Sequence, residues 1–224
     1  ELEAGATLLG SPEMADYPAL PYTSEFRNTA LIVAIDAEDV AVTGFGAIDG
    51  NSDAFMLDGQ PDLSRDFLPE CTRQGEAYCL VNDQAEEGPL AHKPRPGILM
   101  LFLKCRGVTV TNVRIRQSPN WCLHVARSEG VLLSGLEIKN SLLVPNADGI
   151  DVSRSRNVRI TGCNIEGGDD GLAFSPCAEG YGAGGCENVV VDNCTIVSRS
   201  AGIRIGWDAY DFRNFLFQNI VIHG

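Results

Sequence analysis

The chain has 224 residues, enough to bury a real core as one large domain or two small ones. Its formal net charge of −13 argues against nucleic acid and against an anionic membrane surface as partners. The sequence contains no run of about 18 apolar residues that would span a membrane. No signal-peptide pattern follows Glu1, so we expect any targeting segment to lie outside this sequence.

The 8 cysteines are not spaced as C-x-x-C, and the 3 histidines add no metal-ligand pattern, so we expect neither a metal site nor a cofactor. Two cysteine pairs flank short polar loops and are candidate disulfides: Cys71 with Cys79, and Cys177 with Cys186. Cys163 and Cys194 recur at one position of a repeat described below, and we interpret them as buried thiols. This mixture weakly favours an exported protein, either secreted or periplasmic.

The first 96 residues contain two strand-like stretches followed by a long polar one. Ala30–Ile35 is a short apolar run that suits a buried strand, and residues 39–50 alternate apolar and small side chains. Residues 51–96 are polar, contain Gly, Pro and Cys, and have no clear period. We interpret residues 51–96 as a long loop insertion on an ordered scaffold, where function is often found.

A repeat dominates the rest of the chain. Copies of a nine-residue unit begin at 107, 130, 157, 188 and 214, and a weaker copy begins at Asp39. The second, fourth, seventh and ninth positions are apolar in every copy, and the sixth is always Asn or Gly. Asn and Gly at the sixth position predict a tight bend with a left-handed or side-chain-bonded backbone.

Spacings of 23, 27, 31 and 26 residues between copies indicate a solenoid. The unit is strand-sized and rich in β-branched residues, and it lacks the frame of a leucine-rich repeat. An all-β fold, a parallel β-helix, is therefore predicted; a β-sandwich is the alternative, but it would need hairpin turns at closer spacing. We expect one domain over residues 1–224, incomplete at one or both ends because the final IVIHG is a strand without a cap.

A second short strand follows each unit and can be aligned by its apolar pairs. These pairs are Leu123/Val125, Ile150/Val152, Leu172/Phe174 and Ile203/Ile205. The residues two before each pair then form one column, Trp121, Asp148, Asp170 and Ala201, and the residues between each pair form another, His124, Asp151, Ala173 and Arg204. We therefore expect Asp148 and Asp170 to be neighbours on successive coils, about 5 Å apart, with Asp169 beside them.

Three clustered carboxyls predict acid/base chemistry. Carboxyls this close cannot all ionise freely, so one keeps its proton near neutral pH while others stay charged. That division is what general acid and base hydrolysis requires. A calcium site is the alternative, because a hard cation also prefers clustered carboxylates. Candidate substrate-binding residues around the three aspartates are His124, Asn146, Asp151, Arg204 and Trp121.

Several motifs together resemble glycoside hydrolase family 28, the polygalacturonase-like pectin hydrolases. They are GATLLGS, VTGFGAIDG, RPGILMLFLKCRGVTVTNVRIRQSPNWCLHV, PNADGIDV, GGDDGLAFS and DFRNF, which are spread along most of the chain, from Gly5 to Phe215. The resemblance implies a right-handed parallel β-helix and glycosidic hydrolysis with inversion. It also implies that Asp169 is the general acid and that Asp148 and Asp170 hold and activate water. The implied partner is a polysaccharide or oligosaccharide of pectic or related acidic type.

The chain departs from the family pattern near these aspartates. Ser200-Ala201-Gly202 stands where the family has G-H-G, and Gly171 and Ser175 stand where it has Cys and Lys. The family's later Arg-x-Lys motif has no counterpart; Arg204 is similar to it but sits one coil too early. These departures suggest a divergent branch whose substrate differs. A non-catalytic glycan-binding β-helix and a calcium-dependent polysaccharide lyase remain as alternative functions.

Overall fold

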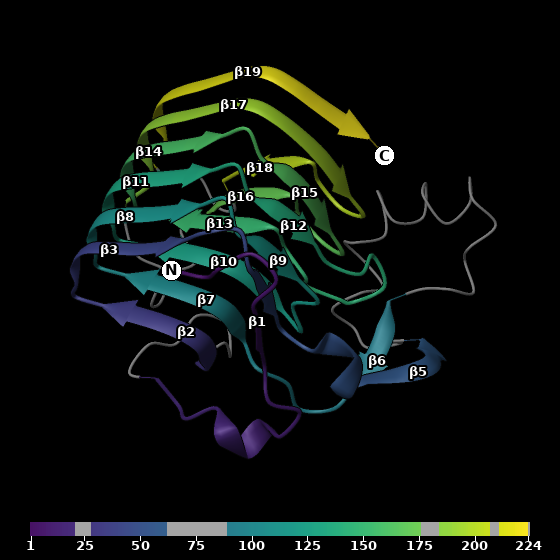
Figure 1. The fold of residues 1–224 in the computed structure, drawn as a ribbon. Coiled ribbons are helices and arrows are strands. Elements are labelled where there is room, and N and C mark those ends of the chain that lie inside the picture. The colour runs from purple at the N-terminus through teal and green to yellow at the C-terminus, as the bar shows by residue number, and fades with distance from the viewer. Residues whose placement is uncertain (21–27, 62–88, 176–183, 207–210, 224) are drawn as a thin grey trace.

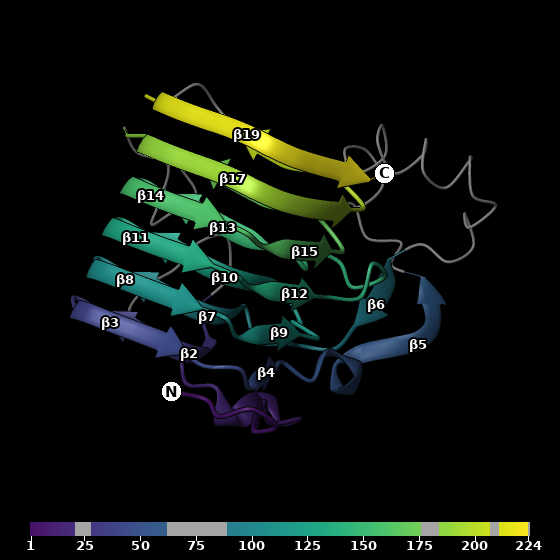
Figure 2. The same ribbon diagram turned by 45° about the horizontal axis from the view of Figure 1, so that its top comes forward.

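The computed structural model describes residues 1–20, 28–61, 89–175, 184–206 and 211–223. Strands run parallel in successive coils that stack from the purple N-terminal end to the yellow C-terminal end (Figure 1). The 45° turn in Figure 2 shows the same coils as two rows of arrows along one side of the stack. The predicted all-β parallel β-helix is confirmed.

The larger sheet of the described residues has eleven strands, with the long β17 joining its two rows. In sheet order they are β1 (Thr7–Leu9), β4 (Ala47–Asp49), β9 (Arg114–Arg116), β12 (Glu137–Lys139), β15 (Asn164–Gly167), β17 (Glu187–Ser198), β14 (Arg156–Thr161), β11 (Glu129–Ser134), β8 (Arg106–Thr111) and β3 (Glu38–Thr43), with β19 (Arg213–His223) paired to β17.

The second sheet faces the first across the core and carries the functional turns described below. Its strand order is β18 (Ile203–Ile205), β16 (Leu172–Ser175), β13 (Ile150–Ser153), β10 (Trp121–Ala126), β7 (Ile98–Leu103) and β2 (Ala30–Ile35). Two short 3-10 helices lie outside the sheets, η1 (Met14–Asp16) and η2 (Ser52–Ala54). Among the described residues no helix is long and apolar enough to cross a membrane.

The predicted repeat is in register from coil to coil. Its second positions form one continuous row across β3, β8, β11, β14, β17 and β19: Val40, Val108, Val131, Val158, Val189 and Phe215. The weaker copy at Asp39 therefore belongs to the same stack. Apolar residues at alternate positions of each strand point inward and form the main core, which is why the pattern has period two.

The sixth position of the repeat is the bend that the sequence predicts. Its residues all have positive φ: Gly44 at 115°, Asn112 at 62°, Gly135 at 61°, Gly162 at 63°, Asn193 at 52° and Asn219 at 52°. Gly reaches this region without a Cβ clash, and Asn tolerates it better than other side chains do. The left-handed bend separates the two rows of the larger sheet.

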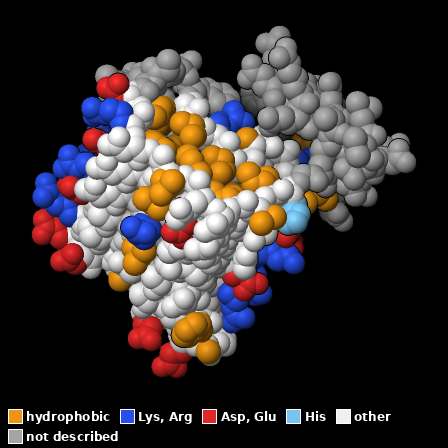
Figure 3. Space-filling view, turned by 90° about the horizontal axis from the view of Figure 1, so that it is seen from above, with side chains coloured by type: hydrophobic (Ala, Val, Ile, Leu, Met, Phe, Trp, Pro, Cys, Tyr) orange, Lys and Arg blue, Asp and Glu red, His pale blue; other side chains and the backbone are white. Residues whose placement is uncertain are grey.

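Stacking of coils is what buries each inward row. Ile196 of β17 is fully buried beneath Ile222 of β19, whereas Ile222 is 51% exposed at the end of the stack. Figure 3 looks onto this end and shows hydrophobic side chains gathered there. Each coil thus depends on its neighbour for burial, as expected of a solenoid.

The cysteine expectations have mixed outcomes. Cys163 and Cys194 are free and buried, so their interpretation as core thiols is confirmed. Burial raises the pKa of the Cys186 thiol to about 11, and Cys186 is free, so the disulfide suggested between Cys177 and Cys186 is wrong. The expectation assumed that Cys186 belongs to a polar loop, but its side chain packs in the main core of the coil. Cys71, Cys79 and Cys177 lie outside the described residues.

The long loop insertion predicted at 51–96 is described at its two ends. Strands β5 (Met56–Pro61) and β6 (Leu90–His92) form a two-stranded antiparallel sheet beside the coil stack (Figure 1). Residues 62–88 lie outside the described part, so the extent of the insertion stays a prediction.

Candidate functional site

The second sheet aligns its strands as the apolar pairs predicted. Leu123 pairs with Ile150, and Leu172 pairs with both Ile150 and Ile203. The column between the apolar pairs is likewise as predicted: His124, Asp151, Ala173 and Arg204 occupy equivalent positions. The turns that lead into β13 and β16 are therefore stacked one above the other.

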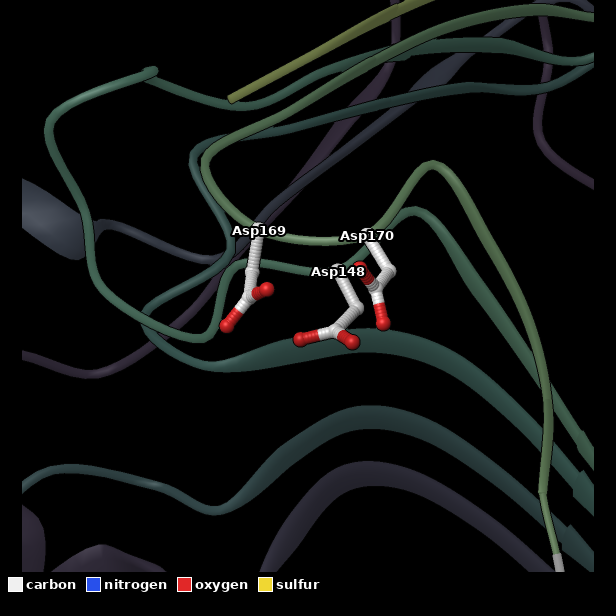
Figure 4. Close-up of side chains that lie close together, drawn as sticks. All are labelled: Asp148, Asp169 and Asp170. Carbon is white, nitrogen blue, oxygen red and sulfur yellow. The ribbon is translucent and has the colours of Figure 1, made fainter. Parts of the chain in front are cut away.

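Those turns bring three carboxylates together. Asp148 lies two residues before β13, while Asp169 and Asp170 lie between β15 and β16. One oxygen from each of the three carboxylates lies within 4.8 Å of the other two. Asp148 and Asp170 are buried, and Asp169 is partly exposed. Figure 4 shows Asp148 directly below Asp170, with Asp169 to one side and all three side chains pointing the same way.

Glycines after the aspartates let the turns stack this closely. The Gly149 N–H donates to the Asp170 carbonyl at 2.9 Å, and the Gly171 N–H donates to the Ala201 carbonyl at 2.9 Å. A Cβ on Gly171 would lie 2.8 Å from the Gly202 carbonyl oxygen, too close for van der Waals contact. The Asp-Gly sequence is thus required by backbone approach as well as by the chemistry of the carboxylate.

Asp170 is held by positive and donor groups. The Arg204 Nη2 donates to Asp170 Oδ1 at 3.0 Å, and the Arg204 Nε forms a close ion pair with Asp170 Oδ2. The backbone N–H of Ala201 also donates to Oδ1, at 3.0 Å. Burial of the Arg204 guanidinium lowers its pKa, but the charge and hydrogen bond of Asp170, with smaller contributions from the other two aspartates, raise that pKa above its usual value.

Asp169 accepts a hydrogen bond from a neutral side chain. The Asn146 side-chain amide donates to Asp169 Oδ2 at 3.2 Å. Asn146 itself has a left-handed backbone with φ of 52°, which aims its side chain across to the next coil. The Ser198 hydroxyl fixes the turn by donating to the Asp169 carbonyl at 2.6 Å. Two adjacent aspartates therefore meet different surroundings.

The trio also has the spacing that a hard cation needs. Calcium would require several oxygens of these carboxylates as ligands. Both oxygens of Asp170 are already contacted by Arg204, and a guanidinium repels a second cation at this distance. The arrangement therefore suits proton transfer better than metal binding.

A family model for the glycosyl hydrolases of family 28 matches residues 73–179, which include all three aspartates. Exopolygalacturonase X of Aspergillus niger is 27% identical over 210 residues, which cover 92% of this chain and 40% of that protein. Exopolygalacturonase X-1 of Emericella nidulans is 29% identical over 164 residues, which cover 71% of this chain and 31% of that protein. The chain is related to family 28. It spans about a third to two fifths of the length of these relatives.

Two solved structures share the fold of this chain. A hyperthermoactive exopolygalacturonase from Thermotoga maritima matches with a TM-score of 0.66 and 24% identity, covering 98% of this chain and 53% of the other. A polygalacturonase from Erwinia carotovora matches with a TM-score of 0.63 and 20% identity, covering 98% and 62%. The likeness shows a shared β-helix.

The other predicted site residues lie along the strands beside the trio. His124 and Asp151 are buried neighbours on β10 and β13, and a His124 ring nitrogen hydrogen-bonds the Ser153 hydroxyl at 3.0 Å. The Trp121 ring stands edge-on to His124, with ring centroids 5.0 Å apart, and packs in a small cluster with Leu101. Trp121 is therefore packed as a core residue is. Substrate contact by these three side chains stays a prediction.

Sequence reasoning missed Arg95. Its guanidinium donates to the Pro145 carbonyl at 2.8 Å and also to the Pro119 carbonyl. Pro145 leads into the turn that carries Asn146 and Asp148, so Arg95 ties this turn to the preceding coil. The only signal in the sequence is its place in the R-P-G that forms part of the family resemblance.

Proposed function

We propose that the chain forms the catalytic part of an inverting glycoside hydrolase that cleaves a pectic or related acidic polysaccharide or oligosaccharide. The unequal surroundings of the adjacent Asp169 and Asp170 carry this proposal. Asp169 accepts a hydrogen bond from a neutral amide and is assigned the proton for the leaving group, whereas Asp170 accepts from the Arg204 guanidinium and from one backbone N–H and is assigned to hold water. Glycosidic hydrolysis needs both a proton donor for the leaving group and carboxylates that hold and activate water.

In the proposed reaction, Asp169 donates its proton to the glycosidic oxygen as the bond from that oxygen to the anomeric carbon breaks. A water held between Asp148 and Asp170 attacks the anomeric carbon from the opposite face and gives up a proton to a carboxylate. Each turnover moves one proton off Asp169 and one onto the base, and solvent exchange restores both. No cofactor takes part.

The spacing of the carboxylates shapes this proposal. Carboxyls of inverting enzymes usually stand about 6.5–9.5 Å apart, which leaves a gap for water between acid and base. Here one oxygen of each of the three carboxylates lies within 4.8 Å of the other two, and the proposal places the water between Asp148 and Asp170. Proton NMR of the first product anomer tests the stereochemistry; a retained configuration would contradict inversion.

The proposed substrate class rests on the relatives. The matching proteins are named as exopolygalacturonases and an exo-poly-alpha-D-galacturonosidase, the latter from Dickeya chrysanthemi at 26% identity over 195 residues. A galacturonan is therefore the first substrate to test. Such a polymer lies outside cells, which agrees with the expectation of a secreted or periplasmic protein.

The deciding experiment measures reducing-sugar release from polygalacturonate, oligogalacturonides and neutral glycans. We expect release by the wild type on an acidic glycan and a loss of roughly 10²–10⁴-fold in Asp169→Asn. Asp49→Asn is the matched control, because it removes a carboxylate that pairs with Arg116 on β9, away from the trio. Binding without release would favour a glycan-binding module, and an unsaturated product would indicate a lyase.

A further inference from the structure

Arg204 does not extend into solvent but folds back onto Asp170. We propose that Arg204 is a positioning residue that holds both carboxylate oxygens of Asp170, so that Asp170 orients water and proton abstraction falls to Asp148. This proposal rests on the hydrolase function proposed above and assigns different roles to the two carboxylates that hold water.

The contacts occupy both carboxylate oxygens of Asp170. Its Oδ1 accepts from Arg204 Nη2 and from the Ala201 N–H, each at 3.0 Å, and its Oδ2 pairs closely with Arg204 Nε. A protonated carboxyl would turn one oxygen into a donor facing a guanidinium. Two-point contacts between Arg and carboxylate are also the strongest and most directional of side-chain ion pairs. Asp170 therefore orients water but is a poor proton acceptor.

The local structure holds Arg204 in this conformation. Arg204 projects from β18 in the same column as Ala173 on β16, and the small Ala173 leaves space for the guanidinium to reach the turn before β16. Nη2 also donates to the Ser200 hydroxyl at 3.2 Å. The Asp170 side chain is only 7% exposed and that of Arg204 30%, so water screens the pair weakly.

The charges around Asp170 explain why the cluster needs this cation. Among the described residues Asp170 faces Asp148 on the preceding coil, Asp169 in its own turn and Arg204 on the following coil. His124 and Asp151 lie in the neighbouring column, to which Arg204 belongs. Two carboxylates as close as Asp148 and Asp170 would otherwise share one proton. With Arg204 compensating Asp170, Asp148 is free to ionise and accept the proton from water.

The test compares Arg204→Met, Arg204→Lys and the wild type on the same acidic glycan. We expect Arg204→Met to lower kcat by roughly 10–100-fold, which is the rate factor that loss of a charge-assisted hydrogen bond corresponds to. KM should change little. The acidic limb of its kcat–pH profile should move to higher pH, because the Asp148–Asp170 pair then retains a proton. Arg204→Lys should restore only part of kcat, since an ammonium supplies the charge without the two-point geometry.

Two further measurements separate a positioning role from folding and from substrate binding. Asp170→Asn combined with Arg204→Met should cost little more than Asp170→Asn alone, because Arg204 acts through Asp170. A raised KM with unchanged kcat and unchanged pH profile would show that Arg204 binds substrate and would overturn the proposal. If the wild type itself releases no sugar, the hydrolase function fails; if it is active and Arg204→Met keeps full kcat, only the role of Arg204 fails.

Discussion

Two columns of charged residues run across the coils. In one the sign of the charge alternates from coil to coil, and in the other carboxylates stack on carboxylates. On the outer face of the larger sheet the first residues of six strands alternate strictly in sign: Glu38, Arg106, Glu129, Arg156, Glu187 and Arg213. On the second sheet the turns instead stack Asp148 against Asp170, with Asp169 adjacent. The same coil-to-coil register produces both columns, so the difference lies in what each column is for.

The alternating column is what stability alone favours. Arg156 Nη2 lies 2.6 Å from Glu129 Oε2, and Arg213 Nη2 lies 3.5 Å from Glu187 Oε2. Opposite charges directly across a strand pair stabilise it, and like charges destabilise it. The aspartate column breaks this rule inside a buried region, where the partly buried Arg204 pairs with Asp170. Because stacked aspartates destabilise the fold, their presence at this one site indicates that they serve a function there.

The largest expected effect separates the two columns by activity. Asp148→Asn should lower the rate of glycan hydrolysis roughly 10²–10⁴-fold, because it removes the base that accepts the proton of water. The same change should leave the melting temperature equal or higher, because it removes like-charge repulsion. Steady-state kinetics and thermal unfolding of one preparation check both parts. Retained activity, or a destabilised but active variant, would contradict the role assigned to Asp148.

The next effect tests the glycines that let the aspartate turns stack. Gly171→Ala should destabilise the fold by about 1–3 kcal/mol, because the new methyl would press on Ile196 and on the Gly202 carbonyl. It should also reduce activity, since the turn carrying Asp170 must shift. Chemical denaturation and the sugar-release assay measure these two losses.

Gly162→Asn is the matched control for that change. Gly162 has φ of 63° and its nearest neighbour for a Cβ is 4.0 Å away, and Asn occupies the equivalent bend at Asn112 and Asn193. Stability and activity should both stay close to wild type. Equal losses in the two glycine variants would mean that close approach at Gly171 is not the cause.

Much of this comparison was predictable from sequence because a parallel β-helix converts spacing into position. Apolar alternation fixed the register of both sheets, and the column containing Asp148 and Asp170 followed from it. The alternation of apolar residues predicts which side of a strand a residue faces, but it does not predict which other residues cover that side. His124 and Asp151 lie in register between the apolar positions, as their column predicts, yet both are buried.

Long side chains were the other limit. Arg204 has several rotatable bonds, so its strand position alone does not show that its guanidinium turns back to Asp170. Arg95 likewise reaches carbonyls 24 and 50 residues further along the chain, a contact that no local pattern encodes. Such contacts depend on the packed turns around them, which sequence spacing does not describe.

A smaller effect is expected from reversing one sign in the alternating column. Arg156→Glu would place three like charges on successive coils, with Glu129 and Glu187 on either side. We expect a modest fall in melting temperature that shrinks with added salt, and unchanged glycan hydrolysis. Exchanging the pair, Glu129→Arg with Arg156→Glu, should not restore stability fully, because it places Arg106 next to another arginine.

The smallest effect is the pH dependence of that same exposed pair. The hydrogen bond and charge of Arg156 hold the pKa of Glu129 below its usual value. A carboxyl whose pKa is lowered by folding stabilises the protein above its unfolded pKa, and this contribution is lost as the pH falls through the lowered folded pKa. The wild type should therefore melt slightly higher than Arg156→Met near neutral pH, and the two melting temperatures should converge in acid. Convergence at neutral pH in about 1 M salt provides the control, because screening removes the same interaction without protonation. A difference that persists in both acid and salt would assign the effect of Arg156 to packing of its aliphatic stem rather than to charge.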